Sequence, residues 1–133
     1  MIMQAHILLI DDDEDDQFIF KKALGEVAPG YICRVSNSGP EGLYELKTSV
    51  SNPEIIFLDL NMPLMNGFEF LAILKGDAKF AGIPVIIFST SDSPADKKRA
   101  REMGAINFIT KTCEIRELKR DLALLINPKL YTV

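Results

Sequence analysis

Short apolar runs recur along the chain, and each run is followed by a segment in which apolar residues repeat with helical spacing. The runs have the length of β-strands rather than of helices. They cover residues 5–10, 31–35, 55–58, 85–88 and 107–109. The pattern therefore predicts five units, each a strand followed by a helix.

The segments between the runs carry apolar residues three or four positions apart, as on one face of a helix. For the first three helices these residues are Phe20, Ala23, Leu24 and Val27, then Gly42, Leu43 and Leu46, then Phe68, Phe70, Leu71 and Leu74. The fourth helix is expected over residues 97–103 and the fifth over residues 114–126. Gly104 can cap the end of the fourth helix and Pro128 cannot continue the fifth, so both have a predicted end.

The first, third and fourth runs are apolar nearly throughout instead of alternating with polar residues. This is expected of strands in a parallel sheet that helices cover on both faces. The predicted fold class is therefore α/β. Five units are too few to close an eight-stranded barrel, which favours an open, doubly wound five-stranded parallel sheet with five helices. In such sheets ligands bind beyond the carboxyl ends of the strands.

Length and composition favour a single domain. The chain has 133 residues, of which 47% are hydrophobic and 26% charged, enough for a core without disulfides. We expect one domain over residues 1–133, with its core over residues 6–126 and no output domain. No apolar run has the length of a transmembrane helix and no signal-peptide pattern is present, so we expect a soluble, cytoplasmic protein. Cys33 and Cys113 have apolar neighbours, which is typical of buried reduced thiols.

The charge distribution excludes some classes of partner. The formal net charge is −4, and residues 11–16 are six consecutive acids. Nucleic-acid backbones require a positive face on the protein. The basic residues near Lys97 and Lys119 have acidic neighbours and a spacing typical of solvated helix faces. We therefore expect neither a nucleic acid nor a membrane as a partner.

Polar residues follow four of the predicted strands. They are Asp11, Asp12 and Asp13 after the first, Asp59 and Asn61 after the third, Ser89, Thr90 and Ser91 after the fourth, and Lys111 after the fifth. Because the carboxyl ends of parallel strands meet at one edge of the sheet, these side chains should converge. Carboxylates in one crevice repel one another unless a cation bridges them, and Mg²⁺ prefers oxygen ligands. Ser89 and Lys111 could then provide a hydrogen bond and a positive charge to a phosphoryl group.

The acidic block has a structural alternative. It could be only the start of a helix, where acids are favoured by the helix dipole. Asp15 and Asp16 are better placed as the cap and first-turn acids, whereas Asp11 and Asp12 follow the strand directly. Asp59 stands inside an apolar run, where an acid is costly unless it is paired or has a chemical role.

The serine, the lysine and the single histidine also have structural interpretations. A serine after the fourth strand could cap the next helix, although residues 91–93, directly before Pro94, fit that role better than Ser89 does. Lys111 alone would be typical of a surface lysine. His6 lies within the first predicted strand, where we expect a core or strand-edge role and not that of a phosphate donor.

The order of these residues resembles that of a known family. Residues 7–13 (ILLIDDD), 56–63 (IFLDLNMP), 65–67 (MNG), 84–89 (PVIIFS) and 108–111 (FITK) are similar to the receiver domain of bacterial two-component response regulators, the CheY-like family. The resemblance runs from residue 6 to residue 126 and rests on an acidic pair, a lone acid, a hydroxyl and a lysine at four strand ends in order. It implies a flavodoxin-like sheet with strand order 2-1-3-4-5 and a stand-alone receiver.

The resemblance implies that Asp59 accepts a phosphoryl group from a sensor histidine kinase or a phosphotransfer protein and forms an acyl phosphate. The implied Mg²⁺ ligands are Asp11, Asp12, Asp59 and the backbone carbonyl of Asn61. Lys111 would pair with the acid or with a phosphoryl oxygen, and Ser89 would donate a hydrogen bond to that oxygen. Such a domain catalyses only its own phosphorylation and dephosphorylation, so it is not an enzyme in the ordinary sense.

The resemblance also implies a switch and an output surface. Phosphorylation would move Ser89 toward the phosphate and rotate Phe108 inward, although a core phenylalanine would look the same in the sequence. A downstream protein would then bind the face formed by the fourth helix, the fifth strand and the fifth helix. The protein could be a monomer or a phosphorylation-dependent homodimer.

Two positions depart from the family pattern. Thr112 follows Lys111 where the family usually has a proline joined by a cis bond. A cis bond to a non-proline residue costs roughly 3 kcal/mol, so this bond could be trans and Lys111 could lie elsewhere than in the family. Asn66 replaces the commoner aspartate before Gly67 and caps a helix about as well.

Two other functions are open on the sequence alone. In phosphatases of the haloacid dehalogenase type, an aspartate nucleophile after the first strand is followed by a second acid two residues later, as Asp11 and Asp13 would be. That function leaves Asp59 in its apolar strand end without a role. A receiver that binds partners without phosphorylation is permitted by Thr112 but disfavoured by the intact set of acids, hydroxyl and lysine.

Overall fold

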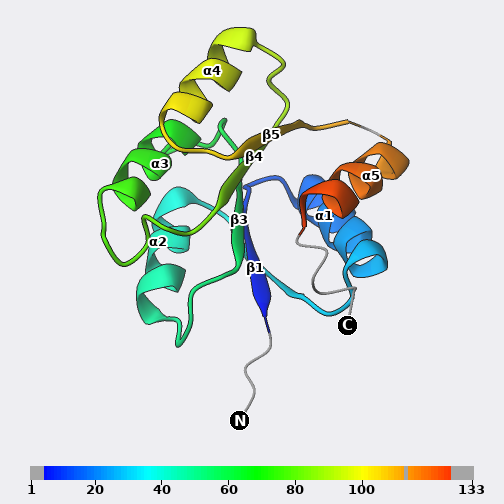
Figure 1. The fold of residues 1–133 in the computed structure, drawn as a ribbon, viewed down its shortest axis with the longest axis horizontal. Helices are drawn as coiled ribbons and strands as arrows, with labels where there is room; N and C mark the ends of the chain where they lie inside the picture. Colours follow the sequence, from blue (N-terminus) through cyan, green and yellow to red (C-terminus); the bar gives the residue numbers. More distant parts are fainter. Residues whose placement is uncertain (1–4, 113, 127–133) are drawn as a thin grey trace.

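The structure is a computed structural model that describes residues 5–112 and 114–126. Strands and helices alternate along the chain (Figure 1). The strands are β1 (His6–Ile10), β2 (Ile32–Ser36), β3 (Ile55–Leu58), β4 (Val85–Ser89) and β5 (Asn107–Thr110). The helices are α1 (Glu14–Val27), α2 (Gly39–Thr48), α3 (Gly67–Lys75), α4 (Pro94–Glu102) and α5 (Ile115–Leu125). The five predicted strand–helix units are confirmed.

The strands form one parallel sheet in the order β2-β1-β3-β4-β5, so the predicted fold class and strand order are confirmed. β1, β3 and β4 lie in the middle of the sheet, and every residue in them is buried. The edge strands β2 and β5 leave part of their residues exposed. This explains why the middle strands are apolar throughout while the edge strands include polar residues.

Helices cover both faces of the sheet. α2, α3 and α4 lie on one side, and α1 and α5 lie on the other (Figure 1). On the first side the core includes Leu58, Leu71 and Leu74. On the second side Phe20 of α1 packs against Phe57 of β3, with ring centroids 4.8 Å apart. Burying one such side chain stabilises the fold by about 1.5–3 kcal/mol, so these two layers hold the sheet in place.

Side-chain caps begin four of the helices. The cap residues are Asp13, Ser38, Asn66 and Ser93, and each accepts a hydrogen bond from a backbone N–H of the first turn. The predicted capping by Asn66 and by a residue just before Pro94 is confirmed. The prediction that Asp15 or Asp16 caps α1 is wrong, because α1 begins at Glu14 and Asp13 already reaches the N–H of Asp16. Asp15 and Asp16 are first-turn acids, the other role expected of them.

α4 has a weaker apolar anchor than its neighbours. Ala100 is the buried residue of this helix. The guanidinium carbon of Arg99 lies 4.0 Å from the ring centroid of Phe68 in α3, a cation–π contact that adds to the packing. Gly104 follows the helix with a φ of 106°, a left-handed conformation that favours glycine, so the predicted end of α4 is confirmed.

Cys33 and His6 lie within strands and not beyond their carboxyl ends. Cys33 is half-buried, and burial raises the pKa of its thiol to about 11, which suits an unreactive reduced cysteine. Cys113 lies outside the described residues. His6 is buried, and burial together with the charge of Arg34 lowers its pKa. Within residues 5–112 and 114–126, no helix is long and apolar enough to cross a membrane.

Candidate functional site

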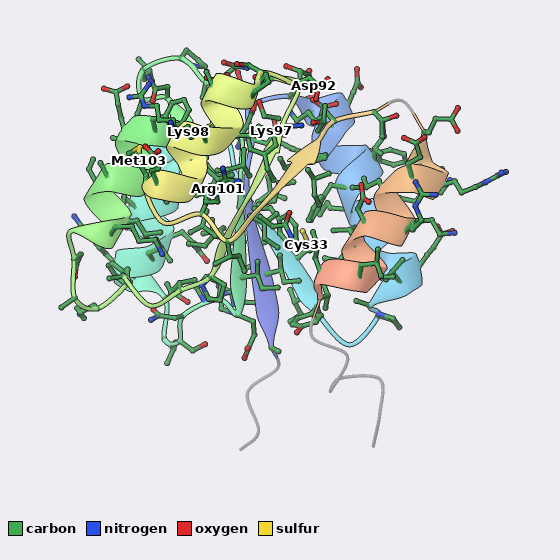
Figure 2. The ribbon with its side chains drawn as sticks, turned by 45° about the horizontal axis from the view of Figure 1, so that its top comes forward. Cys33, Asp92, Lys97, Lys98, Arg101 and Met103 are labelled. Carbon is green, nitrogen blue, oxygen red and sulfur yellow. The ribbon has the colours of Figure 1, made fainter. Side chains whose placement is uncertain are left out.

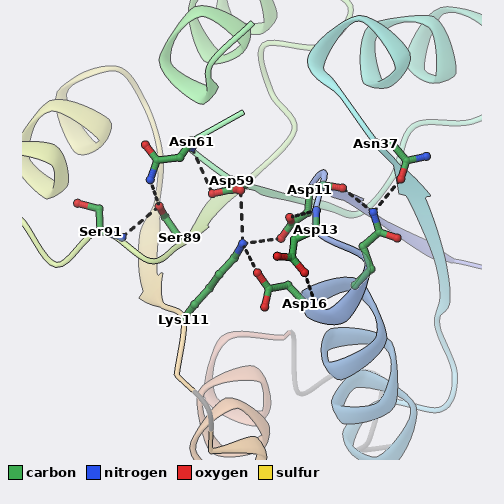
Figure 3. Close-up of polar contacts among 10 residues, drawn as sticks. Asp11, Asp13, Asp16, Asn37, Asp59, Asn61, Ser89, Ser91 and Lys111 are labelled. Carbon is green, nitrogen blue, oxygen red and sulfur yellow. Dashed lines mark hydrogen bonds and ion pairs between the residues drawn. The ribbon is translucent and has the colours of Figure 1, made fainter. Parts of the chain in front are cut away.

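The parallel register brings the ends of β1, β3, β4 and β5 to one edge of the sheet. Ile10 pairs with Leu58 at the ends of β1 and β3. The backbone N–H of Asp59 donates to the carbonyl of Ile10 over 3.0 Å, and that of Lys111 donates to the carbonyl of Ser89 over 2.7 Å. The side chains that follow these strands therefore start from fixed and neighbouring backbone positions (Figure 3).

Three carboxylates gather at this edge. Asp11, Asp12 and Asp59 each place one oxygen within 4.8 Å of the others. Asp11 and Asp59 are buried, whereas Asp12 is exposed. Asp13 has a different position: its carboxylate accepts the N–H of Asp16 over 3.0 Å and caps α1. The structure therefore brings together three of the four acids that the sequence places after β1 and β3.

The Asp11 carboxylate is an incompletely bonded group. Its Oδ1 accepts the backbone N–H of Asp13 over 3.0 Å. Its Oδ2 forms an ion pair with Nζ of Lys111 over 2.8 Å, but this contact does not have the geometry of a hydrogen bond. Among the described residues, Oδ2 of Asp11 is the buried side-chain oxygen that lacks a hydrogen bond. Such an oxygen beside two other carboxylates suits a hard divalent cation. The residues present therefore fit Mg²⁺.

Lys111 is the positive group of the site. Its Nζ lies 2.8 Å from Oδ2 of Asp11, 2.8 Å from Oδ2 of Asp16 and 3.4 Å from Oδ2 of Asp59 (Figure 3). The lysine side chain is only 8% exposed. The bond from Lys111 to Thr112 is trans, as are the other peptide bonds in the described part of the chain. Threonine at this position therefore leaves the ammonium group at the acids.

Burial shifts the pKa values of these groups. It raises the pKa of Asp11 to about 6, against the opposing effects of Lys111 and the N–H of Asp13. It also raises the pKa of Asp59, again against Lys111. Burial alone would lower the pKa of Lys111, but its contacts with Asp11 and Asp16 raise it above its usual value. One ammonium group thus compensates the buried carboxylates only in part, which favours additional positive charge.

Neutral groups lie on the other side of Asp59. Ser89 is buried at the end of β4. Its Oγ accepts a hydrogen bond from Nδ2 of Asn61 over 3.5 Å and another from the backbone N–H of Ser91 over 3.3 Å. The N–H of Asn61 donates to Oδ1 of Asp59 over 3.3 Å. Thr90 is exposed. These bonds are longer than the usual value of about 2.9–3.0 Å, so the Ser89 hydroxyl is weakly held.

Two residues at this edge were not predicted from the sequence as parts of the site. Asp16 contacts Lys111, and Gln17 donates through Nε2 to the carbonyl of Asp11 over 2.6 Å and to Oδ1 of Asn37 over 2.8 Å. The sequence favours Asp16 as a cap or first-turn acid of the first helix, but no signal in it indicates a contact with Lys111. No pattern identifies Gln17, because its partners are a carbonyl group and a side chain beyond β2.

Phe108 lines a groove between α4 and β5. It is half-buried, and Nζ of Lys97 lies 5.7 Å from its ring centroid. The groove has a volume of about 290 Å³, and its lining includes Lys97, Ala100, Arg101, Ile106 and Phe108. Lys97 and Arg101 lie on the side of α4 that faces β5 (Figure 2). The groove is therefore lined by both basic and apolar side chains.

Comparison with known proteins gives consistent similarities. The family model of the response regulator receiver domain matches residues 7–123. The protein PilH of Pseudomonas aeruginosa is 28% identical over 118 residues, which cover 89% of this chain and 94% of PilH. The sensor histidine kinase CheAY of Helicobacter pylori is 32% identical over 105 residues, which cover 79% of this chain. The chain spans only 13% of CheAY and 23% of the response regulator PleD of Caulobacter vibrioides.

Solved structures share the fold over nearly the whole chain. The phosphorylated cyanobacterial phytochrome response regulator RcpA has a TM-score of 0.85 and 26% identity, covering 98% of this chain and 97% of RcpA. The Mn²⁺-bound form of the response regulator Rcp1 has a TM-score of 0.82 and 25% identity, covering 97% of this chain and 96% of Rcp1.

Proposed function

The chain belongs to the response regulator receiver domain family, and from this premise we propose that Asp59 accepts a phosphoryl group from a sensor histidine kinase or a phosphotransfer protein. The observation that carries the proposal is the buried Asp59 carboxylate at the end of β3, beside two other acids and the Lys111 ammonium group. Homologues of this family are signalling modules rather than ordinary enzymes. The proposed activity is therefore limited to the protein's own phosphorylation and dephosphorylation.

The proposed reaction is a phosphoryl transfer to a carboxylate. An oxygen of Asp59 forms a bond to phosphorus while the bond between phosphorus and the donor imidazole nitrogen breaks, and the imidazole keeps the electron pair. The product on this chain is an acyl phosphate. Lys111, 3.4 Å from Asp59 Oδ2, is placed to neutralise a phosphoryl oxygen, and the Ser89 hydroxyl can exchange its long hydrogen bonds for one to another oxygen. Positioning and charge neutralisation are the main contributions to such reactions.

We propose that the site holds Mg²⁺ through Asp11, Asp12, Asp59 and the backbone carbonyl of Asn61. The proximity of the three carboxylates and the buried Oδ2 of Asp11 without a hydrogen bond support this assignment. The Mn²⁺-bound form of Rcp1 shows a divalent cation in a protein of similar fold. When bound, the ion would neutralise negative charge on the acids and on the phosphoryl oxygens.

The proposed output is protein binding by the face of α4, β5 and α5. Ser89 is the last residue of β4, directly before the loop to α4, and Phe108 lines the groove between α4 and β5. Movement of Ser89 toward a phosphoryl group and inward rotation of Phe108 would change the shape of this groove. A downstream protein, or a second copy of the chain in a phosphorylation-dependent homodimer, would bind the changed face. The proposed compartment is the cytoplasm.

The phosphatase alternative has less support. It requires Asp11 as the nucleophile and Asp13 as the second acid. The Asp13 side chain instead caps α1 and is not one of the three clustered acids. Asp59, which that alternative leaves without a role, lies inside the cluster.

Intact-protein mass spectrometry after incubation with acetyl phosphate tests the proposal. We expect one added phosphoryl group on the wild-type protein with Mg²⁺, and none with a chelator or in Asp59→Asn. Asp12→Ala should need more Mg²⁺ for the same adduct, and circular dichroism checks that each variant is folded. An adduct on Asp59→Asn would contradict the proposal. So would a folded wild-type protein that forms no adduct and binds no beryllofluoride, which mimics even a short-lived phosphoryl group.

A further inference from the structure

The Lys111 ammonium group lies closer to Asp11 and Asp16 than to Asp59. Lys111 donates to Oδ2 of Asp16 over 2.8 Å and to Oδ2 of Asp59 over 3.4 Å (Figure 3). Its 2.8 Å contact with Asp11 is an ion pair without hydrogen-bond geometry. Charge-assisted hydrogen bonds are strongest at about 2.7–2.9 Å, so the Asp16 contact is the stronger of the two.

The Asp16 carboxylate is held in place by the start of α1. The N–H of Asp16 donates to the cap residue Asp13 over 3.0 Å. The next residue, Gln17, donates to the carbonyl of Asp11 over 2.6 Å, which ties the first turn to the end of β1. The Asp16 side chain is 29% exposed, against 8% for Lys111, so the pair is shielded from much of the solvent. Asp16 therefore offers Lys111 an acceptor that is already positioned.

We propose that Asp16 is a positioning residue that competes with the phosphoryl site for the Lys111 ammonium group. The inference rests on the proposed function of Asp59. Asp16 is not one of the three clustered acids, so it stays available to Lys111 when a cation occupies Asp11 and Asp59. It keeps Lys111 toward α1 before transfer and leaves the Asp59 oxygen only weakly hydrogen-bonded.

The competition has a direct consequence for the phosphorylated state. A phosphoryl oxygen on Asp59 must draw Lys111 away from Asp16, so part of the new interaction is offset by the weakened ion pair. Removing the Asp16 charge should therefore stabilise the phosphoryl-bound form. Ordinary structural roles of Asp16 predict no such gain, because loss of a supporting contact would weaken the site.

A double-mutant cycle on the metal-free protein tests the contact itself. Asp16→Asn keeps the size of the side chain and removes its charge. We expect the effect of Asp16→Asn on the urea midpoint to be more destabilising when Lys111 is present than in the Lys111→Met background. Asp15→Asn, an equal charge change at an exposed neighbour, should shift the midpoint equally in both backgrounds. Equal effects of Asp16→Asn in both backgrounds would contradict the proposed pairing.

Beryllofluoride binding in the presence of Mg²⁺ tests the competition. At about 0.15 M salt, where exposed charges more than about 8 Å apart are largely screened, we expect Asp16→Asn to bind beryllofluoride about threefold to tenfold more tightly. Asp15→Asn should match the wild type, and Asp16→Glu should restore affinity to near the wild-type value. Unchanged or weaker binding by Asp16→Asn would overturn the inference. If the wild type itself binds no beryllofluoride, the proposed function fails first.

Discussion

Asp59 has different contacts on its two sides, which we call the α1 flank (Asp11, Asp16, Gln17 and Lys111) and the α4 flank (Asn61, Ser89 and Ser91). On the α1 flank the contacts involve charged groups and are short: Lys111 lies 2.8 Å from both Asp11 and Asp16. Gln17 adds a 2.6 Å bond to the backbone of Asp11. On the α4 flank the contacts to Asp59 and Ser89 are neutral or backbone bonds of 3.3–3.5 Å. Asp59 therefore lies between one side with short contacts of charged groups and another side with long, weak hydrogen bonds.

The helices next to the two flanks differ in how much apolar side chain they bury. α1 buries Phe20, Ala23 and Leu24, and it packs beside α5 on the second face of the sheet. α4 buries Ala100 and adds the contact of Arg99 with Phe68. Segments with few buried apolar contacts rearrange at the smallest cost in free energy. A change at Asp59 should therefore move the α4 flank and leave α1 in place.

The largest expected effect is on stability, and it contrasts the two helices. Phe20→Ala should lower the free energy of unfolding by about 3–5 kcal/mol, because its buried ring packs against Phe57 and Phe88. Ala100→Gly in α4 should cost only about 1 kcal/mol, chiefly through helix propensity. Urea denaturation followed by circular dichroism measures both values.

Phe18→Ala is the matched control in α1, because the Phe18 side chain is 68% exposed. It should change stability by less than about 0.5 kcal/mol. Equal losses for Phe20→Ala and Ala100→Gly would show that the two helices are anchored alike.

An intermediate effect concerns the charged flank and pH. Burial raises the pKa of Asp11 to about 6 in the folded protein, above the ordinary value of 3.8 for an aspartate. The folded state then binds a proton more tightly than the unfolded state, so this group adds stability at pH 5 that is lost as the pH rises through 6. With a chelator present, the unfolding free energy of the wild type relative to Asp11→Asn should grow by about 1 kcal/mol from pH 7 to pH 5.

A difference for Asp11→Asn that shrinks on acidification would show that the Asp11 carboxylate is better compensated than its burial indicates.

The smallest expected effect concerns the attachment of α4. Arg99→Gln removes the guanidinium from the ring of Phe68 and should lower stability by about 0.5–1 kcal/mol. Hydrogen exchange should increase in α4 and not in α1. Lys98→Gln is the control, because Lys98 is exposed and contacts Glu102 of its own helix at 3.8 Å. Equal hydrogen exchange of α4 in Arg99→Gln and Lys98→Gln would show that the cation–π contact does not hold this helix in place.

The fold was predictable because its middle strands are buried on both faces and are therefore apolar throughout. The positions of Asp11, Asp59, Ser89 and Lys111 followed from the strand ends, which the parallel register brings to one edge. Their proposed roles remain predictions from the family resemblance.

The contacts among these side chains were not predictable from the sequence. In a run of six acids, a shift of one residue in the helix start turns each side chain by about 100° around the axis, so the partner of Lys111 depends on the cap. The start of α4 was also missed: it begins at Pro94 and not at residue 97, because a helix that buries little apolar surface has little apolar periodicity.

Hydrogen exchange with and without beryllofluoride, in the presence of Mg²⁺, tests the central claim that a phosphoryl group on Asp59 is transmitted through the α4 flank. The account predicts altered exchange in the loop after β4, in α4 and in β5, with little change in α1 and no change anywhere in Asp59→Asn. Binding of beryllofluoride that alters α1 as much as α4, or that alters neither, would contradict it.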